Sequence, residues 1–165
     1  GDGEWGLDSL EFGRIGVTVS GQVELLDFVG TVMGTPVDLE LRNTEGAVLE
    51  RLSARIQSEG SFEFVSDLPS GQYRLAAKAS HWLRMTRDFE MTANGSSGLE
   101  FRLQNGDCDG DNAVTVFDYA ILSDAFDTLQ GDTRWNALAD LDGDDAVTVF
   151  DYSVLSDSFD KIGDP

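Results

Sequence analysis

The chain has 165 residues, 41% of them hydrophobic, with ten Phe and three Trp, a composition that can bury a core and excludes wholesale disorder. Its net charge of −20 gathers at one end, since residues 106–165 hold 15 Asp, no Glu and 2 basic groups. Such a charge repels phosphate and disfavours nucleic-acid binding. No apolar run approaches the roughly 20 residues that insertion into a membrane requires.

Residues 1–13 form an N-terminal segment in which Leu10 and Phe12 alternate as they would in a strand. The segment contains no visible signal peptide and so has the character of a mature or trimmed end. One interpretation makes it a strand donated to the sheet of a neighbouring copy, with Leu10 and Phe12 as partner contacts. The other, which we prefer, makes it a first strand that caps its own domain.

Residues 14–105 carry the pattern of an all-β domain, because short alternating apolar segments are separated by turn residues and no helical period interrupts them. We expect an antiparallel β-sandwich of about 90 residues with seven strands or a similar number. The segments that carry this prediction are residues 15–25, 37–43, 47–56, 61–68, 72–79 and 99–103.

Residues 60–75 read GSFEFVSDLPSGQYRL, in which Phe62 and Phe64 share one face of a strand and Tyr73 begins a return strand after a Pro-Ser-Gly turn. This hairpin resembles one that is common in carboxypeptidase-regulatory-like and prealbumin-like sandwich domains. The resemblance covers about half of the chain and implies an Ig-like or prealbumin-like fold. It implies no activity, because such domains mostly serve as spacers or interaction modules.

From residue 106 the chain contains two copies of an Asp-rich loop followed by a short apolar helix, and residues 107–126 and 140–159 are identical at 15 of 20 positions. Each loop has the 1-3-5-7-9-12 spacing of the EF-hand calcium loop, which surrounds its ion with side-chain oxygens and the backbone carbonyl of position 7. The candidate ligands are Asp107, Asp109, Asp111, Ala113, Thr115 and Asp118, and then Asp140, Asp142, Asp144, Ala146, Thr148 and Asp151.

Four carboxylates this close together repel one another unless a divalent cation lies between them. We therefore predict two structural Ca²⁺ ions, against the alternative of two solvated acidic turns. Position 6, usually glycine, is Asn112 and Asp145, residue types that tolerate a left-handed backbone. Position 8 is Val114 and Val147, which we expect to pair the two loops through a short strand.

The helix that follows each loop carries one apolar stripe at i, i+3 and i+7. Neither short helix can bury its stripe alone, so we expect the two copies to pack face to face with pseudo-twofold symmetry. The stripe residues are Tyr119, Leu122 and Phe126 in the first copy and Tyr152, Leu155 and Phe159 in the second.

A tandem loop and helix without an entering helix, with glycine at position 4 and Asp at position 12, resembles a type I dockerin over about 55 residues. The resemblance implies that calcium folds residues 106–165 and that the helix surfaces at loop positions 10 and 11 bind a cohesin domain. Thr at position 9 departs from the usual Asn or Asp and implies a weaker or water-mediated ligand. The residues at positions 10 and 11 are Val116, Phe117, Val149 and Phe150, where cellulosomal dockerins more often carry small polar pairs.

These apolar pairs must be covered either by the β-domain of the same chain or by another molecule, and the sequence leaves both possibilities open.

The single His81 excludes a histidine-based triad and is expected in a strand beside Trp82. Cys108 excludes an intrachain disulfide and has the character of an incidental small residue rather than a reactive thiol.

The sequence as a whole predicts a mainly β protein with a small α part, extracellular or on a bacterial cell surface, and without enzymatic activity. Our first hypothesis is a self-associating surface or filament subunit that two Ca²⁺ ions rigidify. The alternative is a docking module for a cohesin-like receptor. The expected partner is therefore another copy of the chain or a cohesin-like domain, with no nucleic acid and no membrane insertion.

Overall fold

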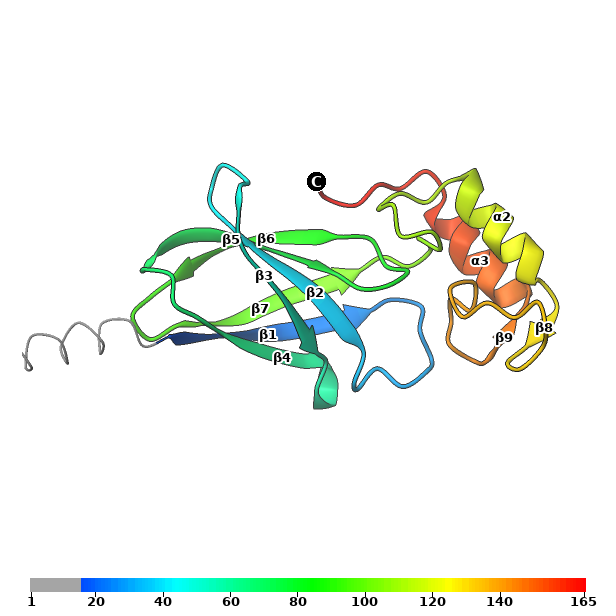
Figure 1. The fold of residues 1–165 in the computed structure, drawn as a ribbon, viewed down its shortest axis with the longest axis horizontal. Helices are drawn as coiled ribbons and strands as arrows, with labels where there is room; N and C mark the ends of the chain where they lie inside the picture. Colours follow the sequence, from blue (N-terminus) through cyan, green and yellow to red (C-terminus); the bar gives the residue numbers. More distant parts are fainter. Residues whose placement is uncertain (1–15) are drawn as a thin grey trace, which may run out of the picture.

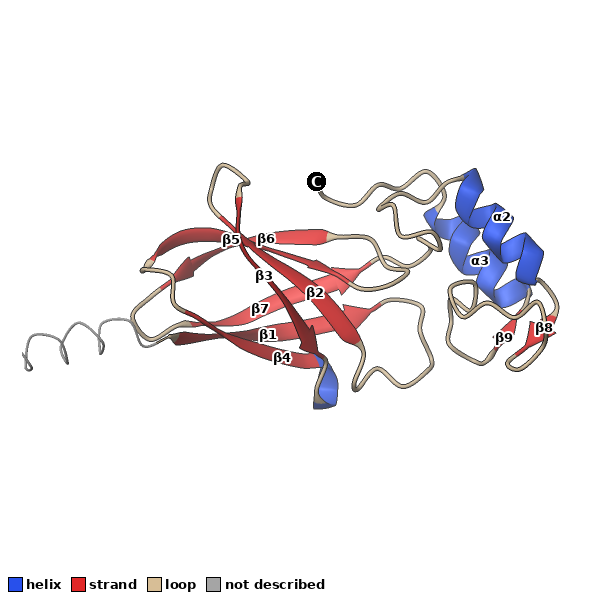
Figure 2. Ribbon diagram, viewed as in Figure 1, coloured by secondary structure: helices blue, strands red, loops and turns tan. Residues whose placement is uncertain are grey.

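The computed structural model describes residues 16–165, in which a β-sandwich is joined end to end to a smaller loop–helix unit (Figure 1). Strands fill the sandwich, and in the described residues two α-helices lie together in the loop–helix unit (Figure 2). The predicted N-terminal segment 1–13, with Leu10 and Phe12, lies outside the described residues. The predicted β-sandwich is confirmed.

Within residues 16–165, seven strands form the two sheets of the sandwich. The first sheet has the order β4-β1-β7, built from β1 (Val17–Leu25), β4 (Ser61–Ser66) and β7 (Ser96–Leu103). The second has the order β3-β2-β5-β6, built from β2 (Pro36–Arg42), β3 (Val48–Arg55), β5 (Gly71–Lys78) and β6 (Met85–Met91). A single 3-10 turn, η1 (Ser58–Gly60), precedes β4.

The prediction of a wholly antiparallel sandwich is wrong at one pair of strands. β1 and β7 run parallel, with Val23 beside Phe101, while the other sandwich pairs are antiparallel. The two strands meet closely at Gly21, where an added Cβ would lie 2.2 Å from the backbone oxygen of Leu99. Periodicity identifies which face of a strand is buried, but it carries no information on the direction of the neighbouring strand.

The predicted hairpin at residues 60–75 is an arch between the two sheets. β4 pairs with β1 whereas β5 pairs with β2 and β6, so residues 67–70 cross from one sheet to the other. Phe62 and Leu75 enter the same core from opposite sides, and the Tyr73 hydroxyl donates to the carbonyl of Pro69 at 2.6 Å. A hairpin and an arch bury the same alternating residues, which is why the sequence pattern does not separate them.

The loop–helix unit contains α2 (Val116–Ala125) and α3 (Val149–Ser158), which lie side by side (Figure 1). Leu122 and Leu155 are buried as predicted, and the rings of Tyr119 and Tyr152 meet edge to face with centroids 5.9 Å apart. The rest of the predicted stripe is not buried, because the two tyrosines and the two phenylalanines at its end are 42% to 45% exposed. The helices end one residue before those phenylalanines, Phe126 and Phe159, which are their C-caps.

The prediction that Val114 and Val147 pair the two loops is also wrong. β9 (Ala146–Val147) in the second loop pairs with β8 (Thr128–Leu129), which follows α2. Reciprocally, Ala113 in the first loop pairs with Ile162, which follows α3. Each helix carries the chain away from its own loop, so the segment that leaves the helix (its exit segment) pairs with the other loop. The expected pseudo-twofold arrangement is present, but the two repeats achieve it by exchanging their exit segments.

The sandwich and the loop–helix unit are joined through Asn105, which is completely buried. Its side-chain amide donates to the carbonyl of Leu141 at 2.6 Å and to that of Leu26 at 3.2 Å, while its oxygen meets the His81 ring 2.8 Å away. His81 lies in the turn after β5 and not in a strand as predicted, because its backbone carbonyl is needed there to accept from the N–H groups of residues 106 and 107.

The C-terminal segment ties the two parts together a second time and runs back along the sandwich near β6 (Figure 1). The Asp164 carboxylate accepts from the N–H of Thr86 at 2.7 Å, and the Asp164 N–H donates to the carbonyl of Arg84. Asn112, in the first Asp-rich loop, accepts from the N–H of Arg84 at 2.7 Å and donates to the carbonyl of Asp164 at 2.9 Å.

Replacing Asn105 with alanine is expected to lower the free energy of unfolding by about 2 kcal/mol or more, because buried carbonyls and the His81 ring lose their partner. Thermal and urea unfolding followed by circular dichroism measure the change. Asn94→Ala, in an exposed turn, is the control and should alter stability by less than about 0.5 kcal/mol. Equal stabilities of the two variants would contradict this role of Asn105.

Candidate metal sites and exposed apolar pairs

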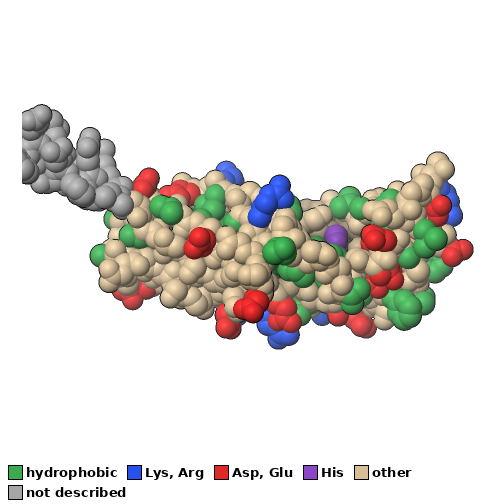
Figure 3. Space-filling model, turned by 90° about the horizontal axis from the view of Figure 1, so that it is seen from below, with side chains coloured by type: hydrophobic (Ala, Val, Ile, Leu, Met, Phe, Trp, Pro, Cys, Tyr) green, Lys and Arg blue, Asp and Glu red, His purple; other side chains and the backbone are tan. Residues whose placement is uncertain are grey.

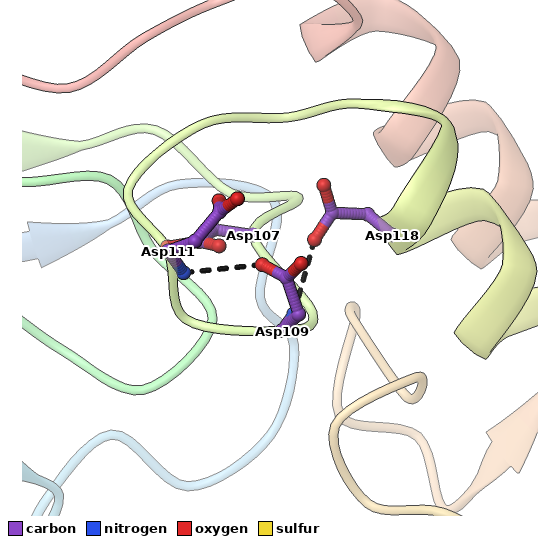
Figure 4. A group of neighbouring side chains, drawn as sticks. All are labelled: Asp107, Asp109, Asp111 and Asp118. Carbon is purple, nitrogen blue, oxygen red and sulfur yellow. Dashed lines mark hydrogen bonds between the residues drawn. The ribbon is translucent and has the colours of Figure 1, made fainter.

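The structure gathers the eight predicted aspartates into two clusters of four. In each cluster, one ligand oxygen from every aspartate lies within 4.8 Å of the others. The first cluster contains Asp107, Asp109, Asp111 and Asp118 (Figure 4), and the second contains Asp140, Asp142, Asp144 and Asp151.

Backbone N–H groups hold the carboxylates of the first loop in place. The N–H of Asp111 donates to Asp109 at 3.1 Å, and the N–H of Asp109 donates to Asp118 at 3.0 Å (Figure 4). Asn112 at position 6 has a φ of 71°, so the left-handed backbone predicted there is confirmed. The chain can therefore curl around the cluster and direct the position 1, 3 and 5 side chains inward.

The second loop repeats this geometry. The N–H of Asp144 donates to Asp142 at 3.2 Å, and the N–H groups of Leu141 and Asp142 donate to Asp151 at 2.7 and 3.1 Å. Asp145 at position 6 has a φ of 67°. Two independent segments thus reach the same local structure from nearly the same sequence.

The residues predicted at positions 7 and 9 are placed differently. Thr115 and Thr148 are the N-caps of α2 and α3, since their hydroxyls accept from the N–H groups of Phe117 and Phe150 at 3.3 and 3.2 Å. The position 12 aspartates complete a capping box with them, a role that the sequence analysis missed although the Thr-x-x-Asp spacing signals it. The position 7 residues Ala113 and Ala146 lie half-buried in the loops, and their carbonyls remain predicted ligands.

Asp107 has an unusual set of partners for a buried carboxylate. Its exposed fraction is 0%, and its Oδ2 accepts from the Lys78 ammonium at 2.9 Å and from the N–H of Asn112 at 3.0 Å. Its Oδ1 is buried and accepts no hydrogen bond from any described residue. A buried, unpartnered carboxylate oxygen is costly, so this atom points to a ligand inside the cluster. Lys78 was not predicted, because nothing in a strand 29 residues earlier marks it as a neighbour of the loop.

Burial raises the pKa values of several cluster carboxyls. Desolvation is the main cause for Asp118 and Asp140. Burial, followed by repulsion from Asp151, raises the pKa of Asp142 to about 7. The clusters therefore resist carrying their full negative charge without a cation.

Cys108 does not take part in the clusters. Its side chain is buried in the small core beneath the helices, and burial, followed by the charge of Asp118, raises the pKa of the thiol to about 12. The thiol therefore stays protonated at neutral pH, in line with the expectation of an unreactive residue.

The apolar pairs at loop positions 10 and 11 lie at the surface. The exposed fractions are 59% for Val116, 67% for Phe117, 60% for Val149 and 66% for Phe150. Figure 3 shows apolar side chains scattered among acidic groups at the loop–helix end of the molecule. Within residues 16–165 the β-domain does not cover these pairs, so the possibility that it buries them is not supported.

No protein-family model and no curated protein matches this sequence. Among the described residues, no helix is long and apolar enough to cross a membrane.

Two solved structures are similar over nearly the whole chain. Both are mutants of a type II cohesin–X–dockerin complex from Acetivibrio cellulolyticus, altered at the N-terminal and the C-terminal interface respectively.

In both structures the similar chain is 24% identical, and the match covers 90% of this chain and 98% of that chain, with TM-scores of 0.68 and 0.66. The likeness shows a common fold for the sandwich and the loop–helix unit together. A weaker match, to the 5-hydroxyisourate hydrolase of Klebsiella pneumoniae, is 22% identical and covers 52% of this chain and 83% of that one, with a TM-score of 0.34 that supports no argument.

The metal-free protein is expected to become more stable on acidification from pH 7 to about 5. The folded pKa of Asp142, about 7, exceeds the ordinary value of 3.8, so its favourable contribution is complete below 3.8 and is lost as the pH rises through 7. Thermal unfolding in metal-free buffer between pH 4 and 8 measures this slope. Asp142→Asn should flatten it, and a wild-type slope of the opposite sign would contradict the assignment.

Proposed function

We propose that this chain is a calcium-stabilised protein-docking unit, in which a β-sandwich carries a dockerin-like pair of loops and helices that binds a cohesin-like receptor domain outside the cell. The observation that carries the proposal is the position of the two Val-Phe pairs. They are exposed, and each begins a helix whose first turn is anchored in an aspartate cluster.

The donor set of each cluster fits calcium. All the side chains that converge are carboxylates, which hard cations prefer, and the loop spacing offers further oxygens from position 7. In the first loop the buried Oδ1 of Asp107 lacks any other described partner. The eight aspartates would hold the two ions, and each ion would supply positive charge that lets its cluster stay ionised.

Calcium in the loops would also stabilise the docking surface. Asp118 and Asp151 belong both to the clusters and to the capping boxes of α2 and α3. Fixing these carboxylates fixes the first turn of each helix, where Phe117 and Phe150 lie. Loops with an aspartate at position 12 instead of the usual glutamate fill readily at the millimolar calcium of extracellular fluid, which supports a location outside the cell.

The comparisons favour docking over the filament that we ranked first from the sequence. A match to 90% of the chain must include most of both the sandwich and the loop–helix unit, and the similar chains come from complexes named for a cohesin and a dockerin. The proposal assigns no catalytic activity to the chain.

Self-association into a surface or filament subunit remains the second candidate. It rests on the same exposed pairs, because an uncovered apolar patch serves a second copy as readily as a different receptor. The two candidates differ in what the Val-Phe pairs touch, so one set of variants tests both.

Isothermal titration of the chelator-treated chain with calcium is expected to show two ions bound per chain. Asp109→Asn and Asp142→Asn should each remove one of them, since each substitution takes a charged oxygen from a different cluster. Asp88→Asn, on an exposed strand position, is the control and should leave two. Absence of calcium binding by the wild-type chain would overturn the calcium sites.

Replacing Phe117 and Phe150 together with serine is expected to weaken receptor binding by at least about tenfold, because aromatic anchors dominate interfaces of this kind. Binding to a panel of immobilised type II cohesin domains in calcium provides the measurement. The thermal stability should change little, as both rings are exposed. Val65→Ser, at an equally exposed apolar position on the sandwich, is the matched control.

Sedimentation velocity in millimolar calcium and then in EGTA separates the two candidates. A chain that stays monomeric and binds a cohesin supports docking. Calcium-dependent oligomers that the Phe117→Ser and Phe150→Ser changes dissolve support self-association instead. A monomer that binds no member of the panel would count against both.

A further inference from the structure

The two loops are nearly identical in sequence, but the sandwich contacts them with different chemistry. The first loop meets a cation, Lys78, at the end of β5. The second meets the loop after β1, where the N–H of the uncharged Val29 donates to the carbonyl of Asp142 at 2.7 Å. In the same place the ring of Phe28 packs on Gly143 so tightly that an added Cβ would lie 2.2 Å from it.

The Lys78 ammonium is held by the sandwich itself. Its three N–H groups share four acceptors, namely the carbonyls of Ala79, Ser80 and Trp82 at 3.3, 3.2 and 3.0 Å and Asp107 Oδ2 at 2.9 Å. The three carbonyls belong to the turn that follows β5, and the lysine side chain is only 15% exposed. The sandwich therefore fixes a positive charge beside the first loop.

Lys78 also decides which oxygen of Asp107 is free. It occupies Oδ2 together with the N–H of Asn112, and Oδ1 is left buried without a described partner. At the same position of the second loop, both oxygens of Asp140 accept only backbone N–H groups, from residues 143, 144 and 145. Within residues 16–165, no Lys or Arg lies within ion-pair distance of an aspartate of the second cluster.

We propose that Lys78 makes the two calcium sites unequal, so that the second loop binds its ion more tightly and fills first. The inference rests on the proposed calcium binding. Calcium affinity rises with the negative charge of the ligand set, and a fixed ammonium on the position 1 ligand offsets one of the four charges of the first cluster. Lys78 acts as a positioning and affinity-setting residue and is not itself a ligand.

The contacts that Phe28 and Val29 make with the second loop act in the same direction. Phe28 packs on Gly143 of that loop, and Asp142 is half-buried whereas its counterpart Asp109 is exposed. Charge interactions are stronger where water is excluded. The contacts from the sandwich therefore add to the one charge difference between the loop sequences, which is Asp145 in the second loop against the neutral Asn112 in the first.

A calcium titration of the ¹⁵N-labelled chain in EGTA-buffered solutions tests this order directly. Gly110 and Gly143 occupy position 4 of the two loops and give one amide reporter for each site. The Gly143 amide is expected to reach its half-change at a calcium concentration about tenfold lower than Gly110 does. Coincident half-changes, or an earlier change at Gly110, would overturn the inference.

Single-site variants assign the cause to Lys78. With the second loop disabled by Asp142→Asn, adding Lys78→Met should tighten calcium binding at the first loop by about tenfold, whereas Lys78→Arg should leave it weak. With the first loop disabled by Asp109→Asn, Lys78→Met should have no effect. Lys161→Met is the control, because it removes the same charge from a lysine that donates to Gln104 and forms no ion pair with any described aspartate.

Circular dichroism of each variant confirms that it is folded before its affinity is compared. If Lys78→Met does not fold, the wild-type titration and Lys78→Arg still decide the question. Two sites of equal affinity would refute the role of Lys78 and leave calcium binding intact. Failure of both loops to bind calcium would refute the proposed function itself, so the two failures are distinguishable.

Discussion

Repulsion among clustered carboxylates is the constraint on which the loop–helix unit depends. Two unit charges 4 Å apart interact by about 4 kcal/mol at the effective dielectric of a protein surface, and each cluster brings four aspartates together. Backbone N–H groups fix the direction of most of these side chains but supply no net charge. Lys78 supplies one positive charge to one cluster. The remaining imbalance is what a bound divalent cation would remove.

This constraint reaches the molecular surface through residues that serve two purposes. Asp118 and Asp151 close the clusters and also complete the capping boxes that start α2 and α3. The exposed Val-Phe pairs lie in the first turn of those helices. A change in the charge of a cluster is therefore expected to alter the stability of the surface that we propose for docking.

The parts that the sequence predicts well are those in which one residue type suits one local conformation. The aspartate spacing, the left-handed position 6 residues and the buried Leu122 and Leu155 are of this kind. The sequence fails where partners lie far apart in the chain. The direction of β7 beside β1, the arch in place of a hairpin and the contact of Lys78 with Asp107 all depend on how whole sheets and units pack, which periodicity does not record.

The exchange of exit segments between the two repeats has a consequence for synthesis on the ribosome. The first loop begins at residue 107, but its position 7 residue pairs with Ile162, which emerges much later. The sandwich can complete its seven strands while the rest of the chain is still being made. The first loop can be closed only after the second helix has left the exit tunnel, so the two repeats must fold together and after the sandwich.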